Sequence, residues 1–155
     1  IGLEQLKKLD QQIKKRNLIA NRYLIGLKDY YESYSILKKP DLKCQTCPLK
    51  KNIKKCNKCI HAYYRLNLFV NRNKISQIEL IKQLNEKGIN CRIGACPEIY
   101  REKLFKKLNI YPQKRLINAK LLGETSIMFP INPYKSILKI NSEIHSIKKI
   151  LNMYL

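Results

Sequence analysis

The spacing of hydrophobic residues changes along this chain, and the order of those changes limits the folds that it can adopt. Residues 3–31 place apolar side chains mostly three or four positions apart, which predicts one long amphipathic helix. Residues 61–70 alternate apolar and polar side chains, which predicts a half-buried strand with Tyr64 on the same side as Leu66. The chain therefore combines a long first helix with a strand that needs a sheet.

More helices and strands are expected further along. Ser76 and Glu79 form a capping box that predicts a helix through Lys87, closed by Gly88. We also expect a strand at 89–93, a helix at 97–108, a short helix at 118–122, a proline-bounded edge strand at 127–131, and a last helix capped by Asn141 or Ser142 with Ile144, Ile147, Ile150 and Leu151 inward. This order predicts an α+β sandwich, a small sheet with helices mainly on one face.

Lysine dominates the charge of the chain. There are 32 basic and 11 acidic residues, for a net charge of +21. Such a balance suits a polyanion partner such as nucleic acid, an anionic membrane or a phosphorylated substrate. The 25 Lys, 22 Ile and 14 Asn against 4 Ala also match the drift of an A/T-rich genome. Charge alone therefore does not choose between a selected surface and composition drift.

Two CxxC pairs form the clearest metal-binding pattern. Four thiolates suit a tetrahedral Zn²⁺ site, and nearby lysines would favour the deprotonated thiols. The predicted ligands are Cys44, Cys47, Cys56 and Cys59. Free or redox-active thiols, a disulfide and a lost site are the alternatives. We expect Cys91 and Cys96 to be buried or loop thiols rather than ligands.

The linker between the two CxxC pairs is basic. In a zinc knuckle it would offer a hook for RNA or DNA through Lys50, Lys51, Lys54, Lys55 and Lys58. No apolar run is long enough to cross a bilayer, so we expect a cytoplasmic protein.

Several blocks in order along the chain carry a family resemblance. They are IGLEQLKKLD at 1–10 with Arg16, Ala20 and Tyr23, HAYYRL at 61–66, GINC at 88–91, CPEIYREK at 96–103, RLINAK at 115–120 and LGETS at 122–126. Together they resemble the C-terminal part of the DegT/StrS-type family of PLP-dependent nucleotide-sugar aminotransferases. The resemblance covers nearly the whole chain except the cysteine pairs, which that family pattern does not lead us to expect.

The resemblance implies a homodimeric fold-type I enzyme that moves an amino group from an amino-acid donor to a nucleotide-linked keto sugar. It also implies a division of the chain: a helix at 1–31 that leads from a missing cofactor domain, a loop at 32–60 with the CxxC pairs, and a small domain at 61–155. The Schiff-base lysine, and with it PLP, belongs to the missing domain. We therefore nominate no catalytic residue here and expect this chain to be inactive alone.

The resemblance places residues 92–100 beside the active-site cleft. Arg92 or Arg101 would pair with a diphosphate, and Tyr63 or Tyr100 would stack on a base or sugar. The plainer alternative is that each is a solvated arginine or a packed tyrosine. For His61 we expect a structural role.

Two other functions stay open on the sequence alone. One is a free-standing basic zinc module that binds RNA or DNA. The other is a non-catalytic partner that pairs with a separate PLP-bearing chain.

Overall fold

The computed structural model describes residues 2–39, 60–94 and 98–155 of the chain. Its elements follow one another as α1 (Gly2–Lys7), α2 (Leu9–Gly26), α3 (Lys28–Glu32), β1 (Leu37–Lys38), β2 (Arg65–Val70), α4 (Gln77–Glu86), β3 (Arg92–Ile93), the 3-10 turn η2 (Ile99–Arg101), α5 (Lys103–Lys107), α6 (Ile117–Thr125), β4 (Ser126–Pro130), α7 (Ile137–Leu151) and the 3-10 turn η3 (Asn152–Tyr154). This is the α+β class that the sequence predicts.

The described strands form one antiparallel sheet in the order β1, β2, β4, β3. In the central pair, Leu66 of β2 lies opposite Phe129 of β4 and Leu68 lies opposite Ile127. Because the side chains of a strand alternate between faces, these four residues share one face and Arg65 and Asn67 point to the other. The sheet therefore has an apolar inner face and a more polar outer face.

The prediction that the strand near 127–131 lies at an edge was wrong, because β4 is flanked by β2 and β3. Pro130 has no N–H to donate to a neighbouring strand, but it is the last residue of β4, where this donor is not needed. On the side of β2 the ladder continues through Ile131, whose N–H donates to the carbonyl of Tyr64 at 3.3 Å. On the other side β3 pairs only as far as Met128, so no neighbour needs a donor from Pro130.

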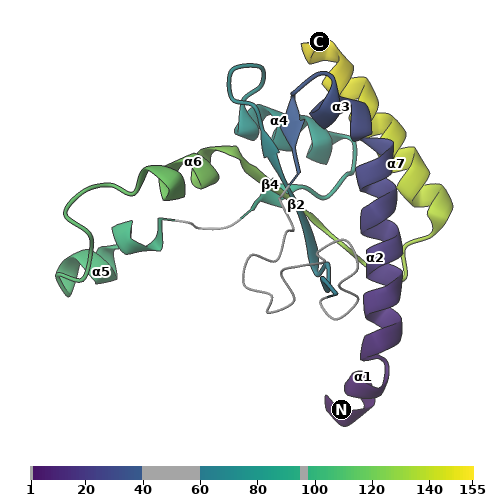
Figure 1. Ribbon diagram of the computed structural model, residues 1–155, viewed down its shortest axis with the longest axis horizontal. Coiled ribbons are helices and arrows are strands. Elements are labelled where there is room, and N and C mark those ends of the chain that lie inside the picture. The colour runs from purple at the N-terminus through teal and green to yellow at the C-terminus, as the bar shows by residue number, and fades with distance from the viewer. Residues whose placement is uncertain (1, 40–59, 95–97) are drawn as a thin grey trace, which may run out of the picture.

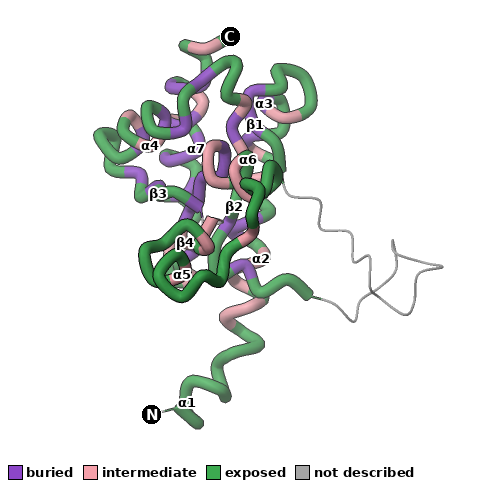
Figure 2. Tube along the Cα trace, turned by 90° about the vertical axis from the view of Figure 1, so that its left-hand side faces the viewer, coloured by how far each residue is buried: buried purple, intermediate pink, exposed green. Residues whose placement is uncertain are grey.

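Helices α2, α4 and α7 cover the inner face, and α2 and α7 run side by side (Figure 1). Figure 2 shows the buried residues gathered between these helices and the sheet. All four predicted inward residues of α7 are buried. The largest side chains that are almost fully buried are Tyr23, Leu27, Ile36, Leu37, Leu66, Leu68, Leu80, Leu84, Ile127, Ile140, Ile147 and Leu151. The core thus lies on one face of the sheet, as predicted.

A buried polar cluster joins α2 to α7 within this core. The hydroxyl of Tyr23 donates to Glu143, and the amine of Lys135 lies 2.9 and 3.1 Å from the two oxygens of the same carboxylate. Burial and the neighbouring carboxylate both raise the pKa of Tyr23, so this hydroxyl keeps its proton and stays a donor. The cluster satisfies the charge of Glu143, which is buried.

The single long helix predicted for residues 3–31 is broken into three. The chain turns at Lys8, whose N–H donates to Gln5, and again at Leu27. Gly26 precedes the second turn, and a glycine weakens a helix interior. None of the residues of α1 is buried, so the described parts of the chain leave the first turns of the predicted apolar stripe uncovered.

The strand predicted from residue 61 begins later, at Arg65. Tyr63 adopts a positive φ of 43°, which interrupts the alternation before β2 starts. As a result Tyr63 is buried and Tyr64 is exposed, the reverse of the predicted sides. From Leu66 onward the alternation is confirmed.

The ends of several other helices and strands differ from the predicted ones. Gly88, with φ of 73°, follows α4 as predicted, but Ser76 makes no side-chain capping bond. The strand at 89–93 reduces to β3, and the helix at 97–108 divides into η2 and α5 because Glu102 is extended. Helix α6 runs through Gly123 to Thr125, beyond the predicted end at residue 122.

The last helix begins earlier than its predicted cap at Asn141 or Ser142. Ser136 caps it instead, because its hydroxyl accepts from the N–H of Lys139 at 3.3 Å.

Residues 98–125, with η2, α5 and α6, extend away from the sheet (Figure 1), and we call them the arm. In the arm only Thr125 is buried. Within the described residues, none of the helices combines the length and the apolar character that a bilayer crossing requires.

Candidate functional site

The four predicted substrate residues lie in three different places. Arg92 is in β3, Tyr100 and Arg101 are in η2, and Tyr63 directly precedes the exposed Tyr64 and β2. Only Tyr100 and Arg101 share partners with each other. The structure therefore does not bring the four together into one cluster, and their substrate roles stay predictions.

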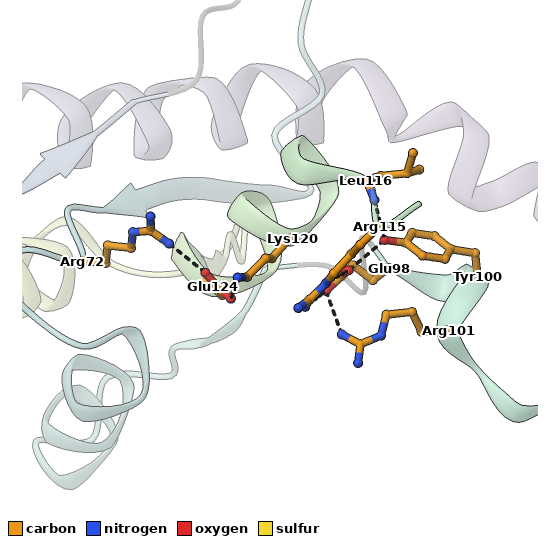
Figure 3. A network of polar contacts seen from close by, with 8 residues as sticks. All are labelled: Arg72, Glu98, Tyr100, Arg101, Arg115, Leu116, Lys120 and Glu124. Atoms are coloured by element: carbon orange, nitrogen blue, oxygen red, sulfur yellow. Dashed lines mark hydrogen bonds and ion pairs between the residues drawn. The ribbon is translucent and has the colours of Figure 1, made fainter. Parts of the chain in front are cut away.

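Glu98 organises the base of the arm (Figure 3). Its carboxylate accepts two hydrogen bonds from Arg115, at 2.7 and 2.6 Å, and lies 3.5 Å from Arg101. The hydroxyl of Tyr100 donates to Glu98 at 2.8 Å and accepts from the N–H of Leu116 at 3.1 Å. Both ends of residues 98–116 are thus fastened by one carboxylate, which the sequence reasoning missed.

This network has an electrostatic consequence for Glu98. Hydrogen bonds from Arg115, opposed in part by desolvation and helped by the Tyr100 bond and the two arginine charges, lower the pKa of this carboxyl from 4.5 to about 2. The hydrogen bond to Glu98 in turn raises the pKa of Arg115. At neutral pH the pair is therefore fully ionised, and Tyr100 and Arg101 already have a protein partner.

A second group of ion pairs connects the C-terminal end of the arm, at Glu124, to the chain just after β2. Glu124 in α6 accepts from Arg72, just after β2, at 2.9 Å, and Lys120 lies 3.7 Å from it (Figure 3). All three side chains are well exposed, so this group positions α6 more than it stabilises the fold.

Tyr63 and His61 pack against each other. Tyr63 donates its backbone N–H to His61 Nδ1 at 3.0 Å, and the two ring centres are 4.3 Å apart. Burial raises the pKa of Tyr63. The His61 carbonyl accepts from the Asn17 amide at 2.7 Å, which links this turn to α2. His61 therefore packs within the turn before β2, and its structural role stays a prediction.

Arg92 lies on the outer face of the sheet, beside a hollow of about 430 Å³. Its Nε donates to Asn90 at 3.3 Å. The hollow is lined by Tyr64, Arg65, Asn90, Arg92, Met128, Pro130, Ile131, Asn132 and Pro133. We take this hollow as the candidate site because it combines two exposed guanidinium groups with an exposed aromatic ring.

The sequence predicts Arg92 as a substrate contact but not the other cationic side chains near Tyr64. The guanidinium of Arg65 lies 5.4 Å from the centre of the Tyr64 ring, and that of Arg16 in α2 lies 6.0 Å from it. Arg65 was detectable as an outward position of the β2 alternation. Arg16 was not, because the packing of α2 near Tyr64 is a tertiary contact.

The predicted zinc ligands, Cys44, Cys47, Cys56 and Cys59, lie outside the described residues, as does the basic linker between them. Within the parts that the structure describes, no three His, Cys, Asp or Glu residues gather as metal ligands would. Cys91 is buried, which raises the pKa of its thiol to about 12, so it is protonated and unreactive.

The sheet and its helices define this chain as part of an aminotransferase-type fold. An aminotransferase from Psychrobacter cryohalolentis is 28% identical, with a TM-score of 0.84 over 99% of this chain and 38% of that one. PseC of Helicobacter pylori, an aminotransferase involved in the biosynthesis of pseudoaminic acid, gives 17% identity and a TM-score of 0.74, over 99% and 36%. NtdA of Bacillus subtilis, with bound cofactor PMP, gives 15% and 0.72, over 97% and 31%.

A family model narrows this class. The DegT/DnrJ/EryC1/StrS aminotransferase family model matches residues 1–141, so the chain belongs to that family. A search among curated proteins found no match. The chain spans only 31–38% of the length of these three solved structures.

The buried lysine–acid pair in the described parts of the chain does not fit PLP. That cofactor needs a lysine amine free to attack its aldehyde, an acid for its ring nitrogen and a grip on its phosphate. Within the described parts of the chain, Lys135 is the lysine that meets a buried acid, and its amine is paired with Glu143. The same carboxylate accepts from Tyr23, so neither group is available to a cofactor.

Proposed function

We propose that this chain is the C-terminal part of a PLP-dependent aminotransferase that acts on a nucleotide-linked keto sugar in sugar or cell-surface polysaccharide biosynthesis. The observation that carries the proposal is the family match over residues 1–141 together with a shared fold over 99% of the chain. The proposed setting is the cytoplasm, and the proposed full-length assembly is a homodimer.

The named relatives support the substrate class and the cofactor. PseC acts in the biosynthesis of pseudoaminic acid, which supports a sugar substrate. NtdA was solved with PMP, the amino form of PLP, which supports the cofactor. Glutamate is the amino donor that we propose, from the family resemblance.

The proposed division of labour leaves the chemistry to a cofactor domain. This chain would close one side of the sugar site with its outer sheet face, where Arg92 lies beside the hollow. The arm, held by Glu98 and Arg115, would set the position of Tyr100 and Arg101. Because the family resemblance assigns the Schiff-base lysine to the cofactor domain, we propose that this chain alone does not transfer an amino group.

The basic zinc module remains the less favoured function. The family match runs through residues 1–141 and so includes the cysteine pairs, whereas an independent nucleic-acid module would not follow an aminotransferase along its whole length. The zinc site itself stays a prediction, now as a feature of the aminotransferase fragment.

A domain exchange tests the proposal. The 155-residue chain would replace the matching part of the Psychrobacter aminotransferase, which retains its own cofactor domain. We expect the exchanged protein to convert glutamate to 2-oxoglutarate once, with the absorbance change of the cofactor, and then to aminate a nucleotide-linked keto sugar. The unmodified 155-residue chain, given PLP and glutamate, should do neither.

The control is the Psychrobacter protein without its matching part. If the exchanged protein folds, binds PLP and still leaves glutamate unchanged, the aminotransferase proposal fails. If it uses glutamate but accepts none of a panel of nucleotide keto sugars, the substrate class fails while the reaction class stands.

A further inference from the structure

A groove runs along the seam between α2 and α7, the two helices that lie side by side (Figure 1). It consists of two adjoining hollows of about 620 and 380 Å³, which share Leu18 and Arg22 as lining residues. None of its lining residues belongs to the outer sheet face on which Arg92 lies, except Pro133 at one end. We call this surface the helix groove.

Apolar side chains line the helix groove and remain open to solvent. Leu18 and Ile25 of α2 lie two helical turns apart and are 72% and 75% exposed, and Ile137 of α7 is also exposed. Single exposed apolar residues are common on protein surfaces. Several that line one concave surface with a polar rim are typical of an interaction site.

The two walls of the groove are held close together. Gly26 of α2 faces Ile144 of α7, and a Cβ at position 26 would lie 2.8 Å from Ile144 Cγ2. The guanidinium of Arg22 also donates to the side chain of Asn141 at 2.7 Å. The groove is therefore formed before any partner arrives, which lowers the cost of binding.

The rim of the groove is positively charged through Lys15, Arg22 and Lys148, and among the described residues no Asp or Glu lines either hollow. The partner of Arg22 is a neutral amide, and Lys15 lies 5.5 Å from the centre of the Tyr134 ring. Neither contact neutralises the charge. At the base of the arm the arginines meet Glu98, whereas this rim leaves its charge free for an acidic partner.

The walls of the groove determine which kind of segment fits it. Backbone groups inside a helix bond to one another, so α2 and α7 offer an occupant only side-chain contacts. An extended peptide would leave its own N–H and C=O groups unpaired there, whereas a helix satisfies them internally. The groove follows residues 15–26 and 137–148, about 16 Å of each helix, which matches about three turns of a third helix.

We propose that the helix groove binds an acidic amphipathic helix of a partner protein. Apolar residues of that helix, spaced three and four apart, pack against Leu18 and Ile25. Its Asp and Glu residues on both flanks pair with Arg22 and Lys148. The docking site attaches this chain to another protein and takes no part in amino transfer, so it does not rest on the proposed function.

Selection from a display library of helical peptides tests the proposal, with the 155-residue chain as the target. The library varies apolar, acidic, basic and neutral residues at every position. We expect enrichment of peptides that have an apolar stripe flanked by Asp and Glu. The affinity of the most enriched peptide would then be measured by fluorescence anisotropy against variants of the chain whose fold circular dichroism has verified.

The apolar contacts are tested by Leu18→Asp and Ile25→Asp. Each should weaken peptide binding at least about tenfold, because an apolar anchor is replaced by a charge that repels the acidic helix. The matched control is Ile78→Asp, since Ile78 in α4 is 70% exposed and lies outside the groove. That control should change the affinity less than about twofold, and equal losses at all three positions would overturn the site.

The charge contacts are tested by an exchange of signs. Lys148→Glu should weaken binding about fivefold, and a peptide in which one flanking Glu is replaced by Lys should recover it. Lys82→Glu, on the exposed side of α4, makes the same change in net charge without touching the groove. If Lys82→Glu weakens binding as much as Lys148→Glu does, the net charge of the chain attracts the peptide and the proposal fails.

Other occupants of the groove would also overturn the proposal. Self-association that Ile25→Asp abolishes in sedimentation would indicate a second copy of the chain. Binding to phosphatidylglycerol vesicles that the same substitution abolishes would indicate a membrane surface. Selection of no helical peptide would count against any helix.

The domain-exchanged protein separates this inference from the proposed function. A peptide that binds the 155-residue chain but not the exchanged protein would show that the cofactor domain covers the groove, and the docking site would fail. Peptide binding to a folded exchange protein that transfers no amino group would keep the docking site and remove the aminotransferase.

Discussion

The body of the molecule and its arm are held together by different means. In the body, α2, α4, α7 and the inner sheet face bury a continuous apolar core. In the arm, hydrogen bonds and ion pairs to Glu98 and Glu124 replace that core, and the apolar side chains Ile99, Leu104, Leu108, Ile110 and Ile117 are more than half exposed. The body therefore specifies the fold, while the arm depends on a few polar contacts and presents apolar surface.

The largest expected effect comes from the core of the body. Leu84 in α4 is completely buried, and Leu84→Ala leaves a cavity that the surrounding helices fill only in part. We expect it to lower the free energy of unfolding by about 2–5 kcal/mol, measured by urea denaturation. A loss below about 1 kcal/mol would mean that the body is not packed as described.

The buried polar cluster should give the next largest effect. Tyr23→Phe removes the hydroxyl that donates to Glu143 and leaves that carboxylate with Lys135 alone. Because the lost hydrogen bond involves a charged group, we expect a loss of about 1.5–3 kcal/mol in the same measurement. Tyr134→Phe is the control, since Tyr134 is exposed and its effect should stay within about 0.5 kcal/mol.

In the arm, the decisive substitution is Glu98→Gln, and its effect should be local. Loss of the charge weakens the bidentate pair with Arg115, so trypsin should cleave residues 99–116 several-fold faster while the urea midpoint hardly moves. Glu32→Gln, which breaks an exposed ion pair with Lys28 outside the arm, should leave the cleavage rate unchanged.

The same carboxylate predicts a pH dependence of the arm. Its pKa is lowered from 4.5 to about 2 in the folded chain, so its ordering effect is complete above pH 4.5 and is lost as the pH falls toward 2. Hydrogen exchange of the arm amides should show opening in that window. The Glu98→Gln arm should be open at every pH, and an unsubstituted arm that opens above about pH 5 would contradict the prediction.

The smallest effect is expected from the apolar surface of the arm. Leu104 in α5 is 60% exposed, so Leu104→Ala should change the free energy of unfolding by less than about 0.5 kcal/mol. Compared with Leu84→Ala, the same chemical change then measures how differently the two regions are held. A loss as large as that of Leu84→Ala would show that the arm has a core of its own.

Much of the body could be predicted from sequence because its signals are periodic. The inward residues of α7 and the alternation from Leu66 onward follow from spacing alone. The central position of β4 could not be predicted from spacing, because the order of strands in a sheet depends on which strands pair. The prolines near β4 suggested an edge position instead. The breaks at Leu27 and Glu102 were also missed, since each depends on the dihedral angles of one residue.

The candidate site was predictable only in part, for a related reason. Arg92 was identified through the family resemblance. Arg65 shares its hollow, and Arg16 lies 6.0 Å from the centre of the Tyr64 ring, through packing of separate elements. Tyr100 and Arg101 were predicted as substrate contacts, but the sequence did not indicate that both contact Glu98. Glu98 and Arg115 are 17 residues apart, and nothing in that spacing indicated that they would meet.

Because β2 pairs with β4, the sheet cannot form until both strands have been synthesised. Arg65 lies opposite Pro130, so the centre of the sheet joins segments separated by α4, β3 and the whole arm, and α2 packs on α7 near the other end of the chain. Contacts between such distant segments form slowly, because a long stretch of chain must be closed first. On the ribosome, α2 and β2 would emerge with their apolar faces uncovered until α7 follows. Synthesis of α7 is therefore the step that completes this core, and a chain stopped before it would leave the apolar face of α2 uncovered.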